Sequence, residues 1–281
     1  MTLDGLILAL LYLGCAYALF WVGKRVFDVL HPAFRVTTEL VDNDNVALAL
    51  ALVGYYLGLV LTIGGVLSGP SHGLVEDMVD ILLYGPLGIV LLNLSTLVSD
   101  KLILFQFDNE REIIHDHNAG TGISEAGVYT ATGLILFGAL SGETGTIWTA
   151  LAFWSVGQLG LILTGLMYEW ITPYSIHTEI ERDNVAVGVS FAGALIAMGN
   201  ILGFAASEEF FSWQRNFLAF GSYALVGLVF LPVVRFATDK LLLPGTSISA
   251  KLVEQDQPHL GVACLEMFSY VSASFLIIWC V

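Results

Sequence analysis

Long apolar runs separated by short polar segments recur eight times along the 281 residues. Each run is close to the ~20 apolar residues that a helix needs to cross a bilayer, where water cannot satisfy the backbone. The segments between the runs are too short to form a separate soluble domain. We therefore predict eight transmembrane helices, over about residues 3–22, 46–66, 79–98, 119–140, 147–167, 185–205, 217–236 and 261–281.

A polar motif precedes every second predicted helix, and it recurs in four copies that align on Asn45, Asn118, Asn184 and His259. In each copy an acidic residue lies a few positions before this anchor, and a small residue lies two positions after it. Small residues at helical spacing let helix backbones approach closely in lipid. The motif residues are Glu39, Asp44 and Asn45 in the first copy, Glu112 and Asn118 in the second, Glu179, Asp183 and Asn184 in the third, and Glu254 and His259 in the fourth.

The helix before each motif also ends on a recurring acid, at Asp28, Asp100, Glu169 and Asp239. The repeating unit is therefore a helical hairpin used four times, and two hairpins form each half of the chain. Because each half contains an even number of spans, the halves have the same orientation. We predict an all-α membrane protein with two parallel four-helix repeats, residues 1–142 and 143–281, dividing near Glu143 and related by a pseudo-twofold axis along the membrane normal.

The basic residues indicate the orientation. Nine of the ten Lys and Arg residues fall on the side that carries the motifs, and only Arg215 falls on the other. Basic residues concentrate on the cytoplasmic side of membrane proteins, so we expect cytoplasmic motifs and periplasmic termini. The formal net charge is -15, and no basic patch is present that could bind phosphates. We therefore expect the lipid bilayer as a partner and no nucleic acid.

Two of the motifs carry a family resemblance. Glu39 with Asn45-Val46-Ala47, and Glu179 with Asn184-Val185-Ala186, each precede a span rich in Ala and Gly. This arrangement resembles the YjfL-like family of bacterial inner-membrane proteins, over nearly the whole chain. The resemblance implies a small tandem four-helix protein of the bacterial inner membrane, and it brings no settled biochemical activity. His259, which follows Pro258, departs from the Asn pattern.

Two glutamates fall deep inside predicted spans. Glu125 and Glu266 each lie seven residues after their anchor, and Tyr129 and Tyr270 follow one turn later, within reach of a hydrogen bond. Ionisable groups at this depth are costly and face a bundle interior or a water-filled path. Two interpretations are open. The pair forms a route for cations or protons, or each Glu is neutral and hydrogen-bonded across helices as structural glue.

The motif acids and asparagines also have two interpretations. Negative charge and Asn side chains are favoured at helix N-termini, which predicts capping and helix-to-helix bonds. Alternatively, four acidic groups gather around one axis and bind a cation, such as a divalent metal or a polyamine. His115 and His117 are candidate metal ligands in one copy only, a position more typical of solvated residues.

Our first functional hypothesis is a polytopic membrane protein that moves protons or cations, polyamines included, past Glu125 and Glu266. The second is a non-catalytic scaffold or envelope-stress component that recruits a cytoplasmic protein partner or forms a homo-oligomer. An enzyme is the third hypothesis, because no nucleophile, nucleotide-binding or metal motif stands out. We expect no cofactor.

Overall fold

The computed structural model describes residues 3–142 and 144–280, and over these ranges the fold is all-helical. Eight helices in this part of the chain are long and apolar enough to cross a membrane, as predicted. The predicted division at Glu143 and the predicted end of the last span at Val281 lie outside the described residues. The eight are α1 (Leu3–Leu30), α2 (Val46–Leu67), α3 (Leu74–Leu102), α5 (Ala119–Ser141), α6 (Ile147–Ile171), α8 (Val185–Ala206), α9 (Trp213–Ala237) and α11 (Leu260–Cys280).

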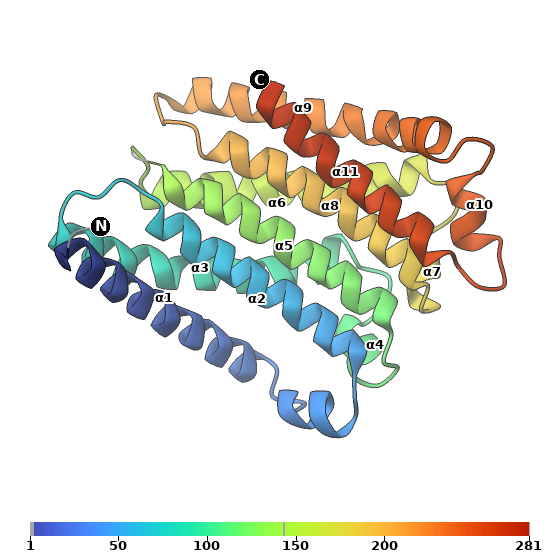
Figure 1. The fold of residues 1–281 in the computed structure, drawn as a ribbon, viewed down its shortest axis with the longest axis horizontal. Helices are drawn as coiled ribbons and strands as arrows, with labels where there is room; N and C mark the ends of the chain where they lie inside the picture. The colour runs from blue at the N-terminus through green and yellow to red at the C-terminus, as the bar shows by residue number, and fades with distance from the viewer. Residues whose placement is uncertain (1–2, 143, 281) are drawn as a thin grey trace.

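Five short elements lie between the spans. The π-helical turn η1 (Thr38–Asp42) precedes α2, and a second π-helical turn, η2 (Thr238–Leu242), follows α9. The one-to-two-turn helices α4 (Asn109–Ile114), α7 (Ile176–Glu181) and α10 (Ile248–Val253) precede α5, α8 and α11. We call the end of the bundle that carries η1, α4, α7 and α10 the motif face. Both chain termini lie toward the other end, the opposite face (Figure 1).

The spans form two layers. Helices α2, α5, α8 and α11, which follow the four motifs, pack side by side in that order and form the motif row (Figure 1). The other four helices cover this row. Helix α3 packs against α2 and α5, α6 against α5 and α8, α9 against α8 and α11, while α1 lies at the edge against α2 and α3. The middle helices α5 and α8 are consequently the most buried of the spans.

Glycine and alanine set the spacing of the motif row. A Cβ atom placed on Gly54 of α2 would lie 2.2 Å from the Cα atom of Ala126 in α5. On Gly127 it would lie 2.6 Å from Cα of Ala192 in α8, and on Gly193 it would lie 2.6 Å from Cα of Met267 in α11. Neighbouring backbones are therefore almost in contact along the whole row. Helix association in lipid is driven by dispersion between such closely packed surfaces, because the lipid tails are as apolar as the helices and provide no hydrophobic driving force.

Two helices extend past their apolar runs. Helix α1 continues to Leu30, beyond the predicted end at residue 22, and α3 begins at Leu74 before the predicted start at residue 79. In α1 the extension contains Lys24 and Asp28, which form an ion pair of 2.7 Å one turn apart. Such pairs support a helix that has left the hydrocarbon region. Hydropathy predicts only the membrane-buried part of a helix, so it underestimates the length of helices that continue into the polar region.

The approach of α5 to α8 provides the first prediction. A Cβ atom on Gly138 would lie 1.8 Å from the carbonyl oxygen of Gly203, whereas Gly221 of α9 has nothing within 4 Å. Gly138→Ala must push two backbones apart, and we expect it to cost about 1–3 kcal/mol, as overpacking of a core does. Gly221→Ala is the control. The apparent melting temperatures in detergent should fall for Gly138→Ala only, and equal melting temperatures for the two variants would contradict the close approach.

Candidate functional site

The first three motif asparagines cap the helices that follow them. The Oδ1 atoms of Asn45, Asn118 and Asn184 accept hydrogen bonds from the backbone N–H three residues on, at 3.0, 2.8 and 3.1 Å. Their Nδ2 atoms donate to the motif carboxylates of Glu39, Glu112 and Glu179, at 3.3, 2.8 and 3.0 Å. The amide oxygen therefore satisfies a free helix N–H, and the amide nitrogen binds the acid of the same copy.

The same amide nitrogens also connect each copy to the next one. Nδ2 of Asn45 donates to the carbonyl oxygen of Ile113 in α4 at 2.9 Å. Nδ2 of Asn118 donates to that of Ile180 in α7 at 2.8 Å, and Nδ2 of Asn184 to that of Leu252 in α10 at 2.9 Å. These carbonyls lie in the last turns of short helices, where α-helical N–H donors run out, and that of Ile180 also accepts the backbone N–H of Asp183 at 2.9 Å. Each motif asparagine thus holds the short helix of the following hairpin.

The fourth copy cannot form this geometry. The residues just before the three asparagines, Asp44, His117 and Asp183, have left-handed backbones with φ of 50°, 52° and 60°. Pro258 occupies that place before His259, and the proline ring fixes φ near −65°. The backbone N–H of His259 instead donates to the carbonyl of Lys251 at 3.0 Å. Within the described chain the fourth copy therefore makes neither the cap nor the link that the three asparagines make.

The motif acids lie along a line. The motif row runs α2, α5, α8, α11, so the four copies follow one another and do not surround one axis. Glu39, Glu112 and Glu179 are each used by their own asparagine. Glu254, His259, His115 and His117 are exposed. In residues 3–142 and 144–280 no group of three or more His, Cys, Asp or Glu side chains could hold a metal ion.

Glu266 is fully buried in α11 and forms an ion pair with Arg235 of α9. The same guanidinium donates to the hydroxyl of Tyr168 at 3.2 Å and to the hydroxyl of Ser249 at 2.9 Å. Its carbon lies 5.6 Å from the centre of the Tyr168 ring, within the range of a cation–π contact. Four residues from α6, α9, α10 and α11 therefore meet at one buried positive charge, and that charge neutralises Glu266.

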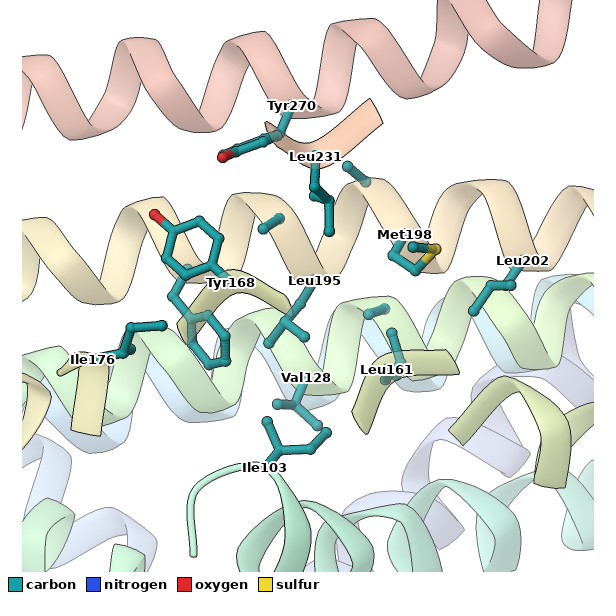
Figure 2. Packing of buried hydrophobic residues seen from close by; sticks show 14 of the residues in the cluster. Ile103, Val128, Leu161, Tyr168, Ile176, Leu195, Met198, Leu202, Leu231 and Tyr270 are labelled. Carbon is teal, nitrogen blue, oxygen red and sulfur yellow. The ribbon is translucent and has the colours of Figure 1, made fainter. Parts of the chain in front are cut away.

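Tyrosines surround this pair. The rings of Tyr168 and Tyr270 make an edge contact with centroids 6.1 Å apart, and both hydroxyls point toward the side of the cluster where Ile176 lies (Figure 2). Burial raises the pKa of Tyr174, between α6 and α7, to about 12. That phenol stays neutral at physiological pH. Tyr270 lies one turn after Glu266, as the spacing predicts, and its hydroxyl makes no hydrogen bond of ordinary length within the described chain.

Arg235 has a role that the sequence pattern of basic residues does not predict. Its position at the end of a span predicts a boundary residue that faces water, yet its side chain is buried and paired. A signal was present in the sequence. Arg235 ends the apolar run Leu231-Pro-Val-Val-Arg235 and lies one turn before the acid Asp239, whereas Thr96 lies one turn before the corresponding acid Asp100.

Glu125 has a different environment. It is 9% exposed and lines a cavity of about 70 Å³ at the motif-face end of the first half. No hydrogen bond or ion pair to its carboxylate occurs in the described part of the chain. The lining extends from Glu125 and Tyr129 to the exposed carboxylate of Glu110, so the cavity reaches the surface. A buried water needs about 10–15 Å³ by this measure, so the cavity has room for several.

The two glutamates occupy equivalent places. Asp100 accepts a hydrogen bond from Nδ2 of Asn109 at 2.7 Å, and Asp239 accepts one from the backbone N–H of Ile248 at 2.8 Å, each nine residues further on. Residues at equal distances from these acids or from the motif anchors can be compared between the halves. Four cavity residues then correspond to four residues around Glu266: Thr96 to Arg235, Phe27 to Tyr168, Ala51 to Ser190, and Glu110 to Ser249. The cavity in the first half therefore lies where the second half contains its arginine and hydroxyls.

Eight apolar helices in two layers, with carboxylates buried between them, define a polytopic α-helical membrane protein. The chain belongs to the DUF350 family, described as a Domain of Unknown Function, whose model matches residues 1–140 and again residues 143–281. The chain is also 24% identical over 270 residues to the "UPF0719 transmembrane protein" of Aquifex aeolicus (strain VF5), covering 94% of this chain and 97% of that protein. No solved structure matches. These matches do not test the resemblance to YjfL-like proteins, which stays a prediction.

The link between hairpins can be separated from capping at Asn118. Asn118→Asp keeps a good N-cap oxygen, but it loses the amide that donates to Ile180 and places a second carboxylate beside Glu112. We expect a loss of about 1–3 kcal/mol, the cost of a buried group left unsatisfied. Thermal unfolding in detergent measures it. His259→Asp is the control, because this residue is exposed. A melting temperature for Asn118→Asp equal to that of the unchanged protein would rule out the linking role.

The Arg235–Glu266 pair predicts non-additive substitutions. Arg235→Met leaves a buried carboxylate without its cation, a change that costs about 3–5 kcal/mol when one partner of a buried pair is removed. Arg235→Met with Glu266→Gln removes both charges, and we expect the double variant to be more stable than Arg235→Met alone. The free energies of unfolding of the single and double variants form a double-mutant cycle. Additive effects would show that the two charges do not interact.

Proposed function

We propose that the protein moves protons or small cations across the membrane through its first half, with Glu125 as the intramembrane carboxylate. One observation carries this proposal: Glu125 is buried, lines a cavity and has no partner among the described residues, whereas Glu266 is neutralised by Arg235. Unpaired carboxylates at membrane depth are costly and are typical of ion and proton pathways. The second half then supplies a rigid frame for the first.

A second cavity in the first half supports a route across the membrane. It has a volume of about 150 Å³ and lies at the other end of α3, where Asp77, Asp80 and Tyr84 line it. Tyr12 and Ser71 both donate hydrogen bonds to Asp77. Between the two cavities α2 and α3 contribute buried apolar side chains, among them Leu59, Ile89 and Leu92. The route is therefore closed between the cavities. Transport requires α2 and α3 to separate there and then to close again.

The orientation belongs to the same proposal. With the motif face in the cytoplasm, the cavity of Glu125 opens to the cytoplasm and the cavity of Asp77 to the periplasm. Both termini are then periplasmic, in a bacterial inner membrane, and the relative in Aquifex aeolicus is a bacterial protein. We retain the division into residues 1–142 and 143–281, with Tyr129 next to Glu125 on the route.

The paired glutamate of the second half favours one alternative, a non-catalytic scaffold. There the intramembrane acid is fully buried and paired, as expected for structural glue. Such a scaffold would present the exposed acidic groups of the motif face, such as Glu110 and Glu254, to a cytoplasmic partner. A scaffold has no need of an unpaired Glu125, so substitution of this residue is the test that distinguishes the two functions.

Flux into proteoliposomes tests the proposal. The experiment compares protons, Na⁺, K⁺ and polyamines for the unchanged protein, for Glu125→Gln and for Glu266→Gln. We expect Glu125→Gln to lower the flux of the transported ion by about tenfold or more, because Gln cannot carry the charge, while the protein stays folded. Glu209→Gln on the exposed opposite face is the matched control and should leave the flux unchanged.

Two outcomes would contradict transport. One is an absence of flux of all four ions through correctly folded, unchanged protein, and the other is a flux that Glu125→Gln does not alter. Glu266→Gln should lower the melting temperature more than Glu125→Gln, because it leaves Arg235 buried without its counter-ion.

A further inference from the structure

The two halves place the same acid in the same register but fill the space beside it differently. In the second half the guanidinium of Arg235 occupies that space, held by Glu266, Ser249 and the Tyr168 hydroxyl. In the first half Thr96 stands in place of Arg235, and its short side chain leaves the cavity of about 70 Å³ next to Glu125. The second half thus carries the positive group as the side chain of Arg235, and the first half has no such group at the equivalent position.

We propose that the first-half cavity binds a small organic cation of the guanidinium or primary ammonium type, in the place that the Arg235 guanidinium fills in the second half. This inference rests on the proposed function and names the class of cation that Glu125 accepts. Glu125 accepts the N–H groups of the ligand, as Glu266 accepts those of Arg235. The second half therefore serves as an internal copy of the occupied site.

The charges around the cavity suit a cation. Three carboxylates line it, from Glu125, Asp100 and Glu110, and no Lys or Arg does. Asp100 is engaged by Asn109, which leaves Glu125 as the buried acid without a partner in the described chain. His31 is the one lining group that can gain a positive charge, and its Nδ1 lies 3.0 Å from the carbonyl oxygen of Phe27. The Nδ1 atom of His31 is thus engaged by the backbone and does not face Glu125 as an ion-pair partner.

The rest of the lining favours an organic cation over a metal ion. Phe27, Phe34 and Tyr129 contribute aromatic rings, and Leu48, Ala51 and Ile113 contribute apolar surface. Guanidinium is weakly hydrated and stacks on aromatic faces, as Arg235 does over Tyr168 at 5.6 Å. Ca²⁺ and Mg²⁺ take six or more oxygen ligands or waters, and the described residues hold no cluster of His, Cys, Asp or Glu that could supply a metal site.

Binding of methylguanidinium and methylammonium to the purified full-length protein in detergent tests the inference by isothermal titration calorimetry. We expect saturable binding to the unchanged protein and to the exposed control Glu209→Gln. Glu125→Gln should weaken binding by about tenfold or more. Thr96→Arg places a tethered guanidinium in the cavity, so it should abolish binding and raise the melting temperature.

Arg235→Ala provides a positive control, because it opens the equivalent space beside Glu266. Methylguanidinium should restore part of its lost melting temperature, which shows that the assay detects a guanidinium in such a pocket. The inference is wrong if rescue of Arg235→Ala occurs but the unchanged protein binds neither cation. It is also wrong if Glu125→Gln binds as tightly as the unchanged protein, or if Na⁺ and K⁺ at equal concentration displace the organic cations.

The same experiments separate this inference from the proposed function. Flux of protons or metal cations that depends on Glu125, without binding of either organic cation, overturns the inference and leaves transport standing. Binding that depends on Glu125, without flux of any ion, supports the site and overturns transport.

Discussion

The fold depends on the scarcity of water where helices enter a membrane, because each helix end leaves backbone N–H and C=O groups without partners. At three of the four motifs, one asparagine amide supplies hydrogen-bond partners for these unpaired backbone groups. Its oxygen receives the N–H of the helix it starts, and its nitrogen reaches both the acid of its own copy and a carbonyl of the next hairpin. Aspartate, the other strong capping residue, has no donor when ionised and cannot make the second link. Capping and assembly are therefore the same interaction, which explains why Asn occupies the anchor.

The two halves carry a glutamate at the same position of the repeat, but they differ in what stabilises its buried carboxylate. In the second half Arg235 stabilises it, and the resulting pair is enclosed by tyrosines and by α10. The first half has Thr96 instead and leaves Glu125 beside a cavity. A buried pair resists loss of either partner, whereas an unpaired acid next to a cavity can change its charge or its ligand. The paired and the unpaired glutamate are thus separated along the chain.

The sequence predicted the fold far better than the sites. Apolar length and the positions of Asn45, Asn118 and Asn184 located eight spans and four hairpins, because both features are local along the chain. The partner of Glu266 was out of reach, because Arg235 is 31 residues away and lies at the end of a span, where basic residues usually face water. The cavity of Glu125 was equally hidden, since it arises from the short side chains of Thr96 and Ala51 on two different helices. Pattern shows which face of a helix is buried, but the partner across the interface depends on three-dimensional packing.

The motif asparagines also give the row of helices a direction. Each copy binds the one that follows it in the chain, so a row with this chemistry could in principle continue by adding hairpins, as a solenoid adds repeats. Pro258 ends the series, since its ring excludes the left-handed backbone that the other copies adopt before their anchor. Pro258-His259 therefore interrupts the asparagine links at the fourth copy, so this copy is joined to the row by helix packing and not by an anchor amide.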